Sequence, residues 1–206
     1  MDNSLILALS GASYSGKTTK MKELKSVYKD RLLISDEVIR DKNIDIGEVR
    51  ANAKTYLDFE IEVISQKIEN DKNLITQAEQ EHKILLMDRS IFDSMTYFYL
   101  YGKPSDLSEN DLIRFQAFDE YLYKEIIPFY NAHLNGILFF HPLKIDETKL
   151  QKDQYRQNNL VHLQNVEFNM IKTLSYGLFK NHIEEVRVTT WNVKKQDLFS
   201  FNWTKI

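Results

Sequence analysis

The feature that most constrains the fold of this chain is a run near its N-terminus, Gly11-Ala12-Ser13-Tyr14-Ser15-Gly16-Lys17-Thr18. This run matches the pattern G-x-x-x-x-G-K-[S/T] at every fixed position. An apolar segment, residues 4–9, comes before it, and a helix-rich segment, residues 17–29, follows it. In this context the pattern predicts a strand, a glycine-containing loop and a helix, with the backbone N–H groups of the loop surrounding a phosphate chain.

The same motif suggests roles for individual side chains. Lys17 would bridge the β- and γ-phosphates of a nucleotide, and the Thr18 hydroxyl would coordinate the accompanying Mg²⁺ ion. Gly11 and Gly16 are two of only six glycines, and they permit close approach of the backbone. The alternative is a glycine-containing turn that matches the pattern by chance. From the roles of Lys17 and Thr18 we expect ATP and Mg²⁺ as cofactors. The candidate nucleotide-binding residues are Gly11, Ser13, Tyr14, Ser15, Gly16, Lys17, Thr18 and Thr19.

Short apolar runs alternate with longer segments of helical periodicity along the chain. Five runs have the length of buried strands: residues 4–9, 31–34, 84–87, 136–140 and 186–190. This alternation is typical of a parallel sheet with helices on both faces. The sequence therefore predicts an α/β protein with a five-stranded parallel sheet, folded as a single domain over residues 1–206.

The segments between these runs carry helix signals. Apolar side chains recur at three- and four-residue spacing within residues 56–68 and again within residues 160–178. Ser108 precedes residues 109–123 as a predicted N-cap, with Asp111 three residues further on. A run of aromatic side chains is interpreted as core: Tyr97, Phe98, Tyr99 and Tyr101.

Composition and charge exclude several classes of protein. The chain has no cysteine, which excludes a disulfide framework, thiolate metal sites and a cysteine nucleophile. No apolar run approaches the roughly 20 residues of a membrane-spanning helix, and no signal-peptide pattern is present. The formal net charge of −3, without a basic cluster, argues against nucleic acid as a partner. We expect a cytoplasmic protein without a membrane partner, and a homodimer is left open.

An acidic residue ends the third apolar run. Residues 84–87 lead directly into Asp88, at the sheet edge where ligands of open α/β proteins bind. A carboxylate there can orient Mg²⁺ or its water, although strands also commonly stop at a turn-forming aspartate. Arg89 follows, and its planar guanidinium can hold phosphate oxygens in bidentate contacts. The alternative is that Arg89 pairs with Asp93 on the next helix.

This part of the sequence resembles a group of kinases. The Asp88-Arg89 pair, followed by Asp93 and Tyr97, is similar to the corresponding segment of thymidylate kinases, deoxynucleoside kinases and nicotinamide-riboside kinases with a phosphate-binding loop (P-loop). The resemblance implies a P-loop NTPase fold in which Arg89 approaches the acceptor or the transferred phosphoryl group. It also implies that Asp93 and Tyr97 bind the acceptor. Ser90 stands where thymidylate kinases usually have Tyr or His, and their Pro-Gly-Gly stretch is missing, which argues against thymidylate as substrate.

A second segment resembles the same kinases. Asp36-Glu37-Val38-Ile39-Arg40 contains the Glu-x-x-Arg pattern that they carry after the second strand. The resemblance implies that Glu37 and Arg40 lie at the acceptor, and a carboxylate there can orient the attacking hydroxyl. Asp36 could do the same as Glu37. Alternatively, both acids cap the following helix and Arg40 lies on a solvated face.

Residues 141–159 form a candidate lid. This polar segment follows the fourth apolar run, at the position where P-loop kinases place a lid over the phosphates, and it carries several basic side chains. Among them, Arg156 matches a position of the family. Closure of such a lid would exclude water and add positive charge at the phosphates. A solvated, charged helix end is the alternative.

These features together predict an ATP-dependent kinase that transfers the γ-phosphoryl group to a small-molecule phosphoryl acceptor. Three predicted arginines around one pocket, Arg40, Arg89 and Arg156, favour a nucleoside monophosphate over a neutral nucleoside. The alternatives are a P-loop ATPase with a regulatory or assembly role and a kinase acting on a polynucleotide or modified base. The Asn-Lys-x-Asp motif of guanine-nucleotide switches is absent from the sequence. The predicted catalytic residues are Lys17, Glu37, Asp88, Arg89 and Arg156, and the predicted Mg²⁺ ligands are Thr18 and Asp88.

Overall fold

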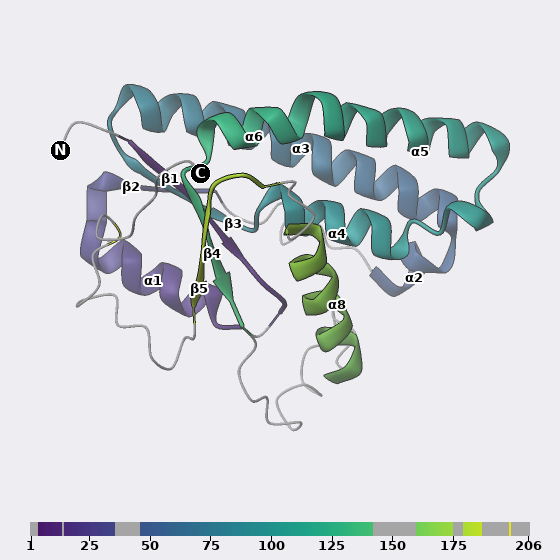
Figure 1. Cartoon of the computed structure of the whole chain (residues 1–206), viewed down its shortest axis with the longest axis horizontal. Helices are drawn as coiled ribbons and strands as arrows, with labels where there is room; N and C mark the ends of the chain where they lie inside the picture. The colour runs from purple at the N-terminus through teal and green to yellow at the C-terminus, as the bar shows by residue number, and fades with distance from the viewer. Residues whose placement is uncertain are drawn as a thin grey trace.

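A five-stranded parallel sheet lies at the centre of the computed structural model (Figure 1). The structure describes residues 4–13, 15–35, 46–141, 160–174, 179–186 and 198. The strand order is β2-β3-β1-β4-β5, so the chain crosses over β1 between β3 and β4. The strands are β1 (Leu5–Ser10), β2 (Leu32–Ser35), β3 (Ile84–Asp88), β4 (Gly136–Phe140) and β5 (His182–Val186).

The predicted α/β class and five-stranded parallel sheet are confirmed. The first four predicted strands coincide with β1 to β4 to within one residue at each end. The predicted start of the fifth strand, residue 186, is wrong, because β5 begins at His182; Val186 does lie in β5, and the rest of the predicted segment, residues 187–190, lies outside the described part. β5 pairs with β4 at the sheet edge, and its sequence, His-Ile-Glu-Glu-Val, has a buried side chain only at Val186 and therefore contains no apolar run.

Helices cover both faces of the sheet. The helices are α1 (Lys17–Tyr28), α2 (Ile46–Ala51), α3 (Ala53–Gln80), α4 (Ile91–Tyr101), α5 (Glu109–Tyr121), α6 (Ile127–His133) and α8 (Leu160–Thr173), with short turns η1 (Lys29–Arg31), η3 (Pro104–Asp106) and η4 (Leu122–Ile126). On one face, Met21 of α1 belongs to the same core cluster as Leu7 of β1. On the other face, Ile64 of α3 shares a cluster with Ile6 of β1. Alternate side chains of β1 therefore serve two cores.

The helices begin near the residues at which the sequence predicts them, and several are longer than the segments with apolar periodicity from which they were predicted. The predicted N-cap is confirmed, because the Asp111 backbone N–H donates to Ser108 Oγ at 3.2 Å. The helix after Ser108 continues through the π-helical turn η4 into α6. The predicted helix at residues 56–68 lies inside α3, which Asn52 caps by accepting from the Thr55 N–H at 3.0 Å. The end of the last predicted helix, residues 175–178, lies outside the described residues.

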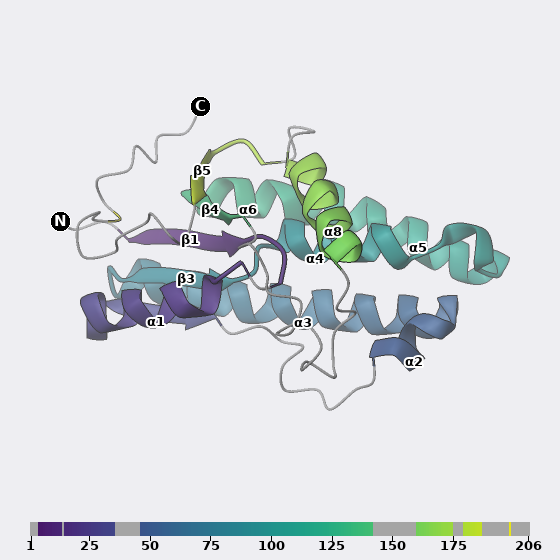
Figure 2. The same ribbon diagram turned by 90° about the horizontal axis from the view of Figure 1, so that it is seen from below.

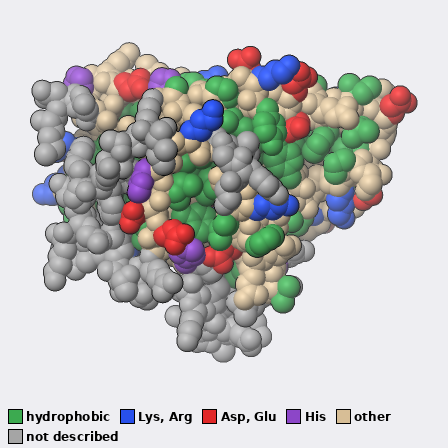
Figure 3. All heavy atoms as spheres, in the orientation of Figure 1, with side chains coloured by type: hydrophobic (Ala, Val, Ile, Leu, Met, Phe, Trp, Pro, Cys, Tyr) green, Lys and Arg blue, Asp and Glu red, His purple; other side chains and the backbone are tan. Residues whose placement is uncertain are grey.

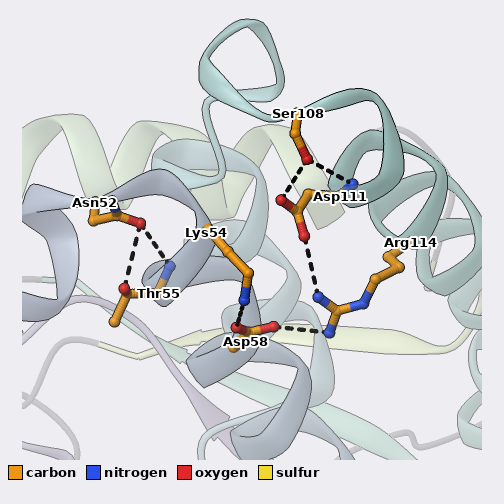
Figure 4. Close-up of polar contacts among 7 residues, drawn as sticks. All are labelled: Asn52, Lys54, Thr55, Asp58, Ser108, Asp111 and Arg114. Atoms are coloured by element: carbon orange, nitrogen blue, oxygen red, sulfur yellow. Dashed lines mark hydrogen bonds and ion pairs between the residues drawn. The ribbon is translucent and has the colours of Figure 1, made fainter.

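α3 and α5 extend past the edge of the sheet to which the strand arrowheads point (Figure 2). An ion-pair network joins the first two turns of these helices, and Figure 4 shows it. Arg114 contacts Asp58 at 2.8 Å and Asp111 at 3.3 Å, and Lys54 contacts Asp58 at 2.7 Å. Hydrogen bonds from Lys54 and then Arg114 lower the pKa of Asp58. These pairs are largely exposed, so each contributes at most about 1 kcal/mol, and they align the two helices more than they stabilise them.

Charged side chains of both signs are spread over the surface. On the face drawn in Figure 3, the Lys and Arg side chains of the described residues are interspersed with Asp and Glu. Among the helices of the described segments, none is both long and apolar enough to cross a membrane.

Candidate nucleotide-binding site

The loop after β1 adopts the backbone geometry that its glycines predict. Gly11 has a φ of +126° and Gly16 a φ of +87°, which are values that residues with a side chain rarely adopt. A Cβ atom at Gly11 would lie 2.3 Å from the Phe140 carbonyl oxygen at the end of β4. Gly16 is the N-cap of α1 and brings no side chain to that helix terminus. The loop therefore packs against the carboxyl edge of the sheet, at the positive end of α1.

Lys17 is folded into this loop. Its Nζ donates to the carbonyl oxygens of Gly11 at 2.7 Å and Ala12 at 2.8 Å, and to Ser15 Oγ at 3.1 Å. The side chain is buried. An ammonium group has three donors, and here it faces three oxygens that phosphate oxygens could replace with little movement of the side chain. The loop thus holds a cation where the phosphate chain of a nucleotide would lie.

The other predicted loop residues differ in exposure. Ser13 and Ser15 are buried, Thr18 is half-buried in the first turn of α1, and Thr19 is exposed. Tyr14 lies outside the described residues. Nucleotide contacts of these side chains therefore stay predictions.

We expect Gly11→Ala to destabilise the protein by about 2 kcal/mol or more. The added Cβ would collide with a backbone carbonyl of a central strand, and the positive φ would be strained in alanine. Urea unfolding measures the change. Gly47→Ala, at an exposed position of α2, is the matched control and should not destabilise. Wild-type stability of Gly11→Ala would contradict the loop geometry.

Asp88 ends β3 beside the loop. It lies in register with Leu9 of β1 and is 1% exposed. The Asp88 carboxylate and the Thr18 hydroxyl are oxygen donors of the kind that Mg²⁺ prefers, and Mg²⁺ takes its remaining ligands from phosphates and water. Within the described residues, no group of three or more His, Cys, Asp or Glu side chains could hold a metal ion. The chemistry of this donor set fits a Mg²⁺ ion that arrives with a nucleotide.

Arg89 turns back from the end of β3 towards the loop. Its φ of +87° is unusual for a residue with a side chain, and its backbone N–H donates to the Leu9 carbonyl at 3.1 Å. Its Nη1 donates to the Gly11 carbonyl at 2.9 Å and lies 3.8 Å from Asp93 Oδ2. The guanidinium carbon is 5.7 Å from the centre of the Tyr97 ring, within the range of a cation–π contact. Arg89 therefore lies at the phosphate loop and also pairs with Asp93.

Asp93 lies directly beneath the loop. Its side chain is buried, and its Oδ1 accepts hydrogen bonds from the hydroxyls of Ser10, the last residue of β1, and Ser90, at 3.2 Å from the latter. Burial raises the pKa of Asp93, and the Arg89 guanidinium is the largest of several effects that oppose this rise. The acceptor contact predicted for Asp93 stays a prediction, since its carboxylate contacts protein groups in the structure.

An aromatic cluster, made of Tyr97 and Tyr101 with Arg50, lies beside Arg89, whose guanidinium is within cation–π range of the Tyr97 ring. The Tyr97 and Tyr101 rings are stacked with their centres 6.4 Å apart, and the Arg50 guanidinium carbon is 4.0 Å from the centre of the Tyr101 ring. The interpretation of the aromatic run as core holds for Phe98, which is fully buried, and for Tyr97 and Tyr99, which are half-buried and pack against the same core; Tyr101 is half-buried.

A buried acid, Glu60 of α3, lies beside this cluster. The Tyr56 hydroxyl is 2.6 Å from Glu60 Oε1 and 2.9 Å from the Tyr97 carbonyl oxygen. The single hydroxyl proton of Tyr56 cannot be donated to both acceptors. If the Glu60 carboxyl group is protonated, it can donate to the Tyr56 hydroxyl oxygen, and the Tyr56 hydroxyl can then donate to the Tyr97 carbonyl oxygen. Burial raises the pKa of Glu60 to about 7, which favours this neutral form.

We expect Glu60 to make the stability of the protein depend on pH. The folded-state pKa of about 7 lies above the usual value of 4.5, so the contribution is fully present below pH 4.5 and is lost as pH rises through about 7. The loss is on the order of 3 kcal/mol. Urea unfolding at about pH 5 and about pH 8 should show a smaller pH dependence in Glu60→Gln than in the wild type. Glu62→Gln, an exposed position of α3, should keep the wild-type dependence; equal dependence in both variants would refute the assignment.

Several predicted site residues lie outside the described part of the chain: Tyr14, Asp36, Glu37, Arg40 and Arg156. The candidate lid at residues 141–159 also lies outside it, apart from its first residue. Three residues near the site were missed in the sequence: Ser10, Arg50 and Glu60. A polar residue ending an apolar strand could have indicated Ser10, and an acid inside the apolar stripe of a helix could have indicated Glu60.

Two solved structures share this fold over nearly the whole chain. The NadR protein in complex with NR has a TM-score of 0.63 and 17% sequence identity, and the match covers 92% of this chain and 47% of that chain. Deoxyadenosine kinase from M. mycoides with bound dCTP has a TM-score of 0.61 and 12% identity, with 93% and 94% covered. The chain thus spans about half the length of NadR. No curated protein matches the sequence.

A family profile described as an AAA domain matches residues 6–169. This range contains β1 apart from its first residue, the phosphate loop, Asp88, Arg89 and the aromatic cluster, and it extends into α8. The parallel sheet and the geometry of the loop agree with the P-loop fold of the two structural neighbours. Since the match covers well over half of the chain, the protein belongs to this family of AAA domains and has the P-loop fold.

Proposed function

We propose that the protein is an ATP-dependent kinase that phosphorylates a nucleoside or its monophosphate. The observation that carries the proposal is the convergence of two cations on one carbonyl: Lys17 Nζ and Arg89 Nη1 both donate to the Gly11 oxygen. Lys17 comes from the loop itself, and Arg89 comes from the end of the neighbouring strand β3. Two cations from different elements can contact a phosphoryl group from two sides, and they can thereby stabilise the negative charge of the group while it is transferred.

The residues of the site divide the work of such a transfer. The loop backbone and Lys17 would bind the phosphate chain, and Thr18 and Asp88 would hold Mg²⁺, which when bound neutralises charge on the β- and γ-phosphates. Arg89 would contact the phosphoryl group on its acceptor side. Glu37 is proposed to orient the attacking hydroxyl, with Asp36 as the other candidate for this role.

Two features support a nucleoside as the acceptor. The expectation of a monophosphate rests on Arg40, Arg89 and Arg156 together, and because Arg40 and Arg156 lie outside the described residues, their part in it stays a prediction. Arg89 is engaged with the loop carbonyl and with Asp93, so part of its charge is already balanced. The stacked rings of Tyr97 and Tyr101, flanked by Arg50, offer apolar area and a polar contact of the kind that a planar base can use.

Labelled ATP and a set of acceptors test the proposal. The set contains deoxyadenosine, nicotinamide riboside, the other common nucleosides and the monophosphate of each. Transfer of label to a nucleoside supports the proposal, and faster transfer to the monophosphates would reassign the arginines to the acceptor phosphate. Release of labelled phosphate at a rate that no acceptor changes would contradict a kinase and would indicate an ATPase instead.

A further inference from the structure

The carboxylate of Asp93 is held in a fixed orientation beneath the phosphate loop. Its Oδ1 accepts hydrogen bonds from Ser10, at the end of β1, and from Ser90, which precedes α4. The Asp93 backbone N–H donates back to Ser90 Oγ at 3.1 Å. Hydroxyls from two separate elements therefore fix one carboxylate oxygen, so the carboxylate cannot rotate without breaking a buried hydrogen bond.

This orientation leaves the second oxygen of Asp93 for Arg89. Asp93 Oδ2 accepts no hydrogen bond from the described residues, and Arg89 Nη1 lies 3.8 Å from it. That separation is within ion-pair range but longer than a hydrogen bond. Both side chains are buried, at 7% exposure for Arg89 and 1% for Asp93, so water screens their attraction little.

The loop holds the same nitrogen of Arg89 that faces Asp93. The Nη1 of Arg89 donates to the Gly11 carbonyl oxygen. The backbone of Arg89 has a positive φ, and its N–H donates to the Leu9 carbonyl oxygen of β1. A phosphate chain that enters the loop would compete for the donors now bound to the Gly11 carbonyl, because phosphate oxygens are stronger acceptors. The fixed carboxylate of Asp93 then determines how far the guanidinium can move.

We propose that Asp93 is a positioning residue for phosphoryl transfer, which acts by holding the Arg89 guanidinium against the phosphate loop and not by contacting a substrate. The proposal rests on the proposed kinase function. A substrate-binding role would require the carboxylate to face the acceptor, whereas the contacts given above turn it towards Ser10, Ser90 and Arg89. Its contribution to the reaction should therefore exist only when Arg89 is present.

A double-mutant cycle tests this dependence, with Asp93→Asn, Arg89→Gln and the double variant. Asparagine has the shape of aspartate and keeps an oxygen for the serine hydroxyls. We expect Asp93→Asn to lower kcat about tenfold or more and to raise the KM for ATP by only a few fold, and the double variant to match Arg89→Gln. Purely structural damage would multiply with the effect of Arg89→Gln, so multiplicative effects would overturn the proposal.

Asp71 supplies a matched control. It is buried, accepts from the hydroxyls of Ser35 and Tyr130 and pairs with Lys67 at 2.9 Å, so it resembles Asp93 in its surroundings, but these partners come from β2, α6 and α3 and not from β1 or the residues after β3. Asp71→Asn should lower stability, and its effect should simply multiply with that of Arg89→Gln. Equal coupling of Asp71 and Asp93 to Arg89 would also overturn the proposal.

A binding measurement separates this proposal from the proposed function. Calorimetry with tripolyphosphate, which copies the phosphate chain of ATP, needs no turnover. In the same cycle we expect Asp93→Asn to weaken tripolyphosphate binding at least threefold more when Arg89 is present than when Arg89 is replaced by Gln. If the two substitutions change this affinity independently of each other, the positioning role is refuted. A wild-type protein that binds tripolyphosphate with this coupling but phosphorylates no acceptor would refute the kinase alone. If Asp93→Asn does not fold, Ser10→Ala, which frees the carboxylate to rotate, takes its place in both cycles.

Discussion

Replacing Lys17 with Ala is expected to remove most of the stabilisation that ATP·Mg²⁺ gives to the protein. The ammonium group lies among three loop oxygens, where a phosphate chain would receive its hydrogen bonds. A hydrogen bond to a charged group contributes roughly 1.5–3 kcal/mol, so its loss weakens binding by up to about a hundredfold. At a ligand concentration of about 100 times Kd, stabilisation would fall from about 2.7 to about 0.4 kcal/mol.

Thermal unfolding with and without ATP·Mg²⁺ gives this difference directly. For a chain of this length the wild-type shift in Tm should be roughly 5–10 °C, and that of Lys17→Ala about 1 °C. Lys20→Ala is the matched control, because Lys20 is a buried lysine of the same helix that pairs with Glu23 at 2.9 Å. An equal shift in Lys17→Ala and Lys20→Ala would remove the central claim about the loop.

The second large effect is expected from Asp88→Asn, which should lower turnover by roughly 100-fold while leaving ATP affinity within a few fold. The substitution keeps the shape of a side chain that is 1% exposed, so the core of β3 is preserved. It removes the negative charge that we expect to hold Mg²⁺ opposite Thr18. Much of the catalysis of phosphoryl transfer is electrostatic, and a misplaced metal ion therefore affects the transition state more than binding.

A titration of turnover with Mg²⁺ distinguishes this role from general damage. The variant should need a higher Mg²⁺ concentration for half-maximal rate, and excess Mg²⁺ should restore part of its activity. Asp111→Asn, which changes a buried aspartate of α5 in the ion-pair network of Figure 4, should leave the Mg²⁺ dependence unchanged. If Asp88→Asn showed wild-type turnover at every Mg²⁺ concentration, the carboxylate would have no part in metal binding.

Much of the fold could be predicted from the sequence because its signals are local. A buried strand needs a short apolar run, and β1 to β4 have one, so their positions follow from consecutive residues. The strand β5 carries His182, Glu184 and Glu185 and therefore lacks such a run, and it begins four residues before the predicted start. The other edge strand, β2, is also only partly buried, but its residues 32–34 are apolar, so its position could be read from the sequence.

The site follows the same division. The sequence by itself determined the phosphate loop, because Gly11, Gly16 and Lys17 act through backbone dihedral angles and contacts within a few residues. Only the tertiary structure placed Asp93 under that loop, through a hydrogen bond from Ser10, which lies 83 residues away in the chain. The same holds for the contact between Arg89 and the Gly11 carbonyl. Both contacts arise from the parallel pairing of β1 with β3. The periodicity of a sequence indicates which face of a helix or strand is buried, but it does not indicate which other element packs against that face.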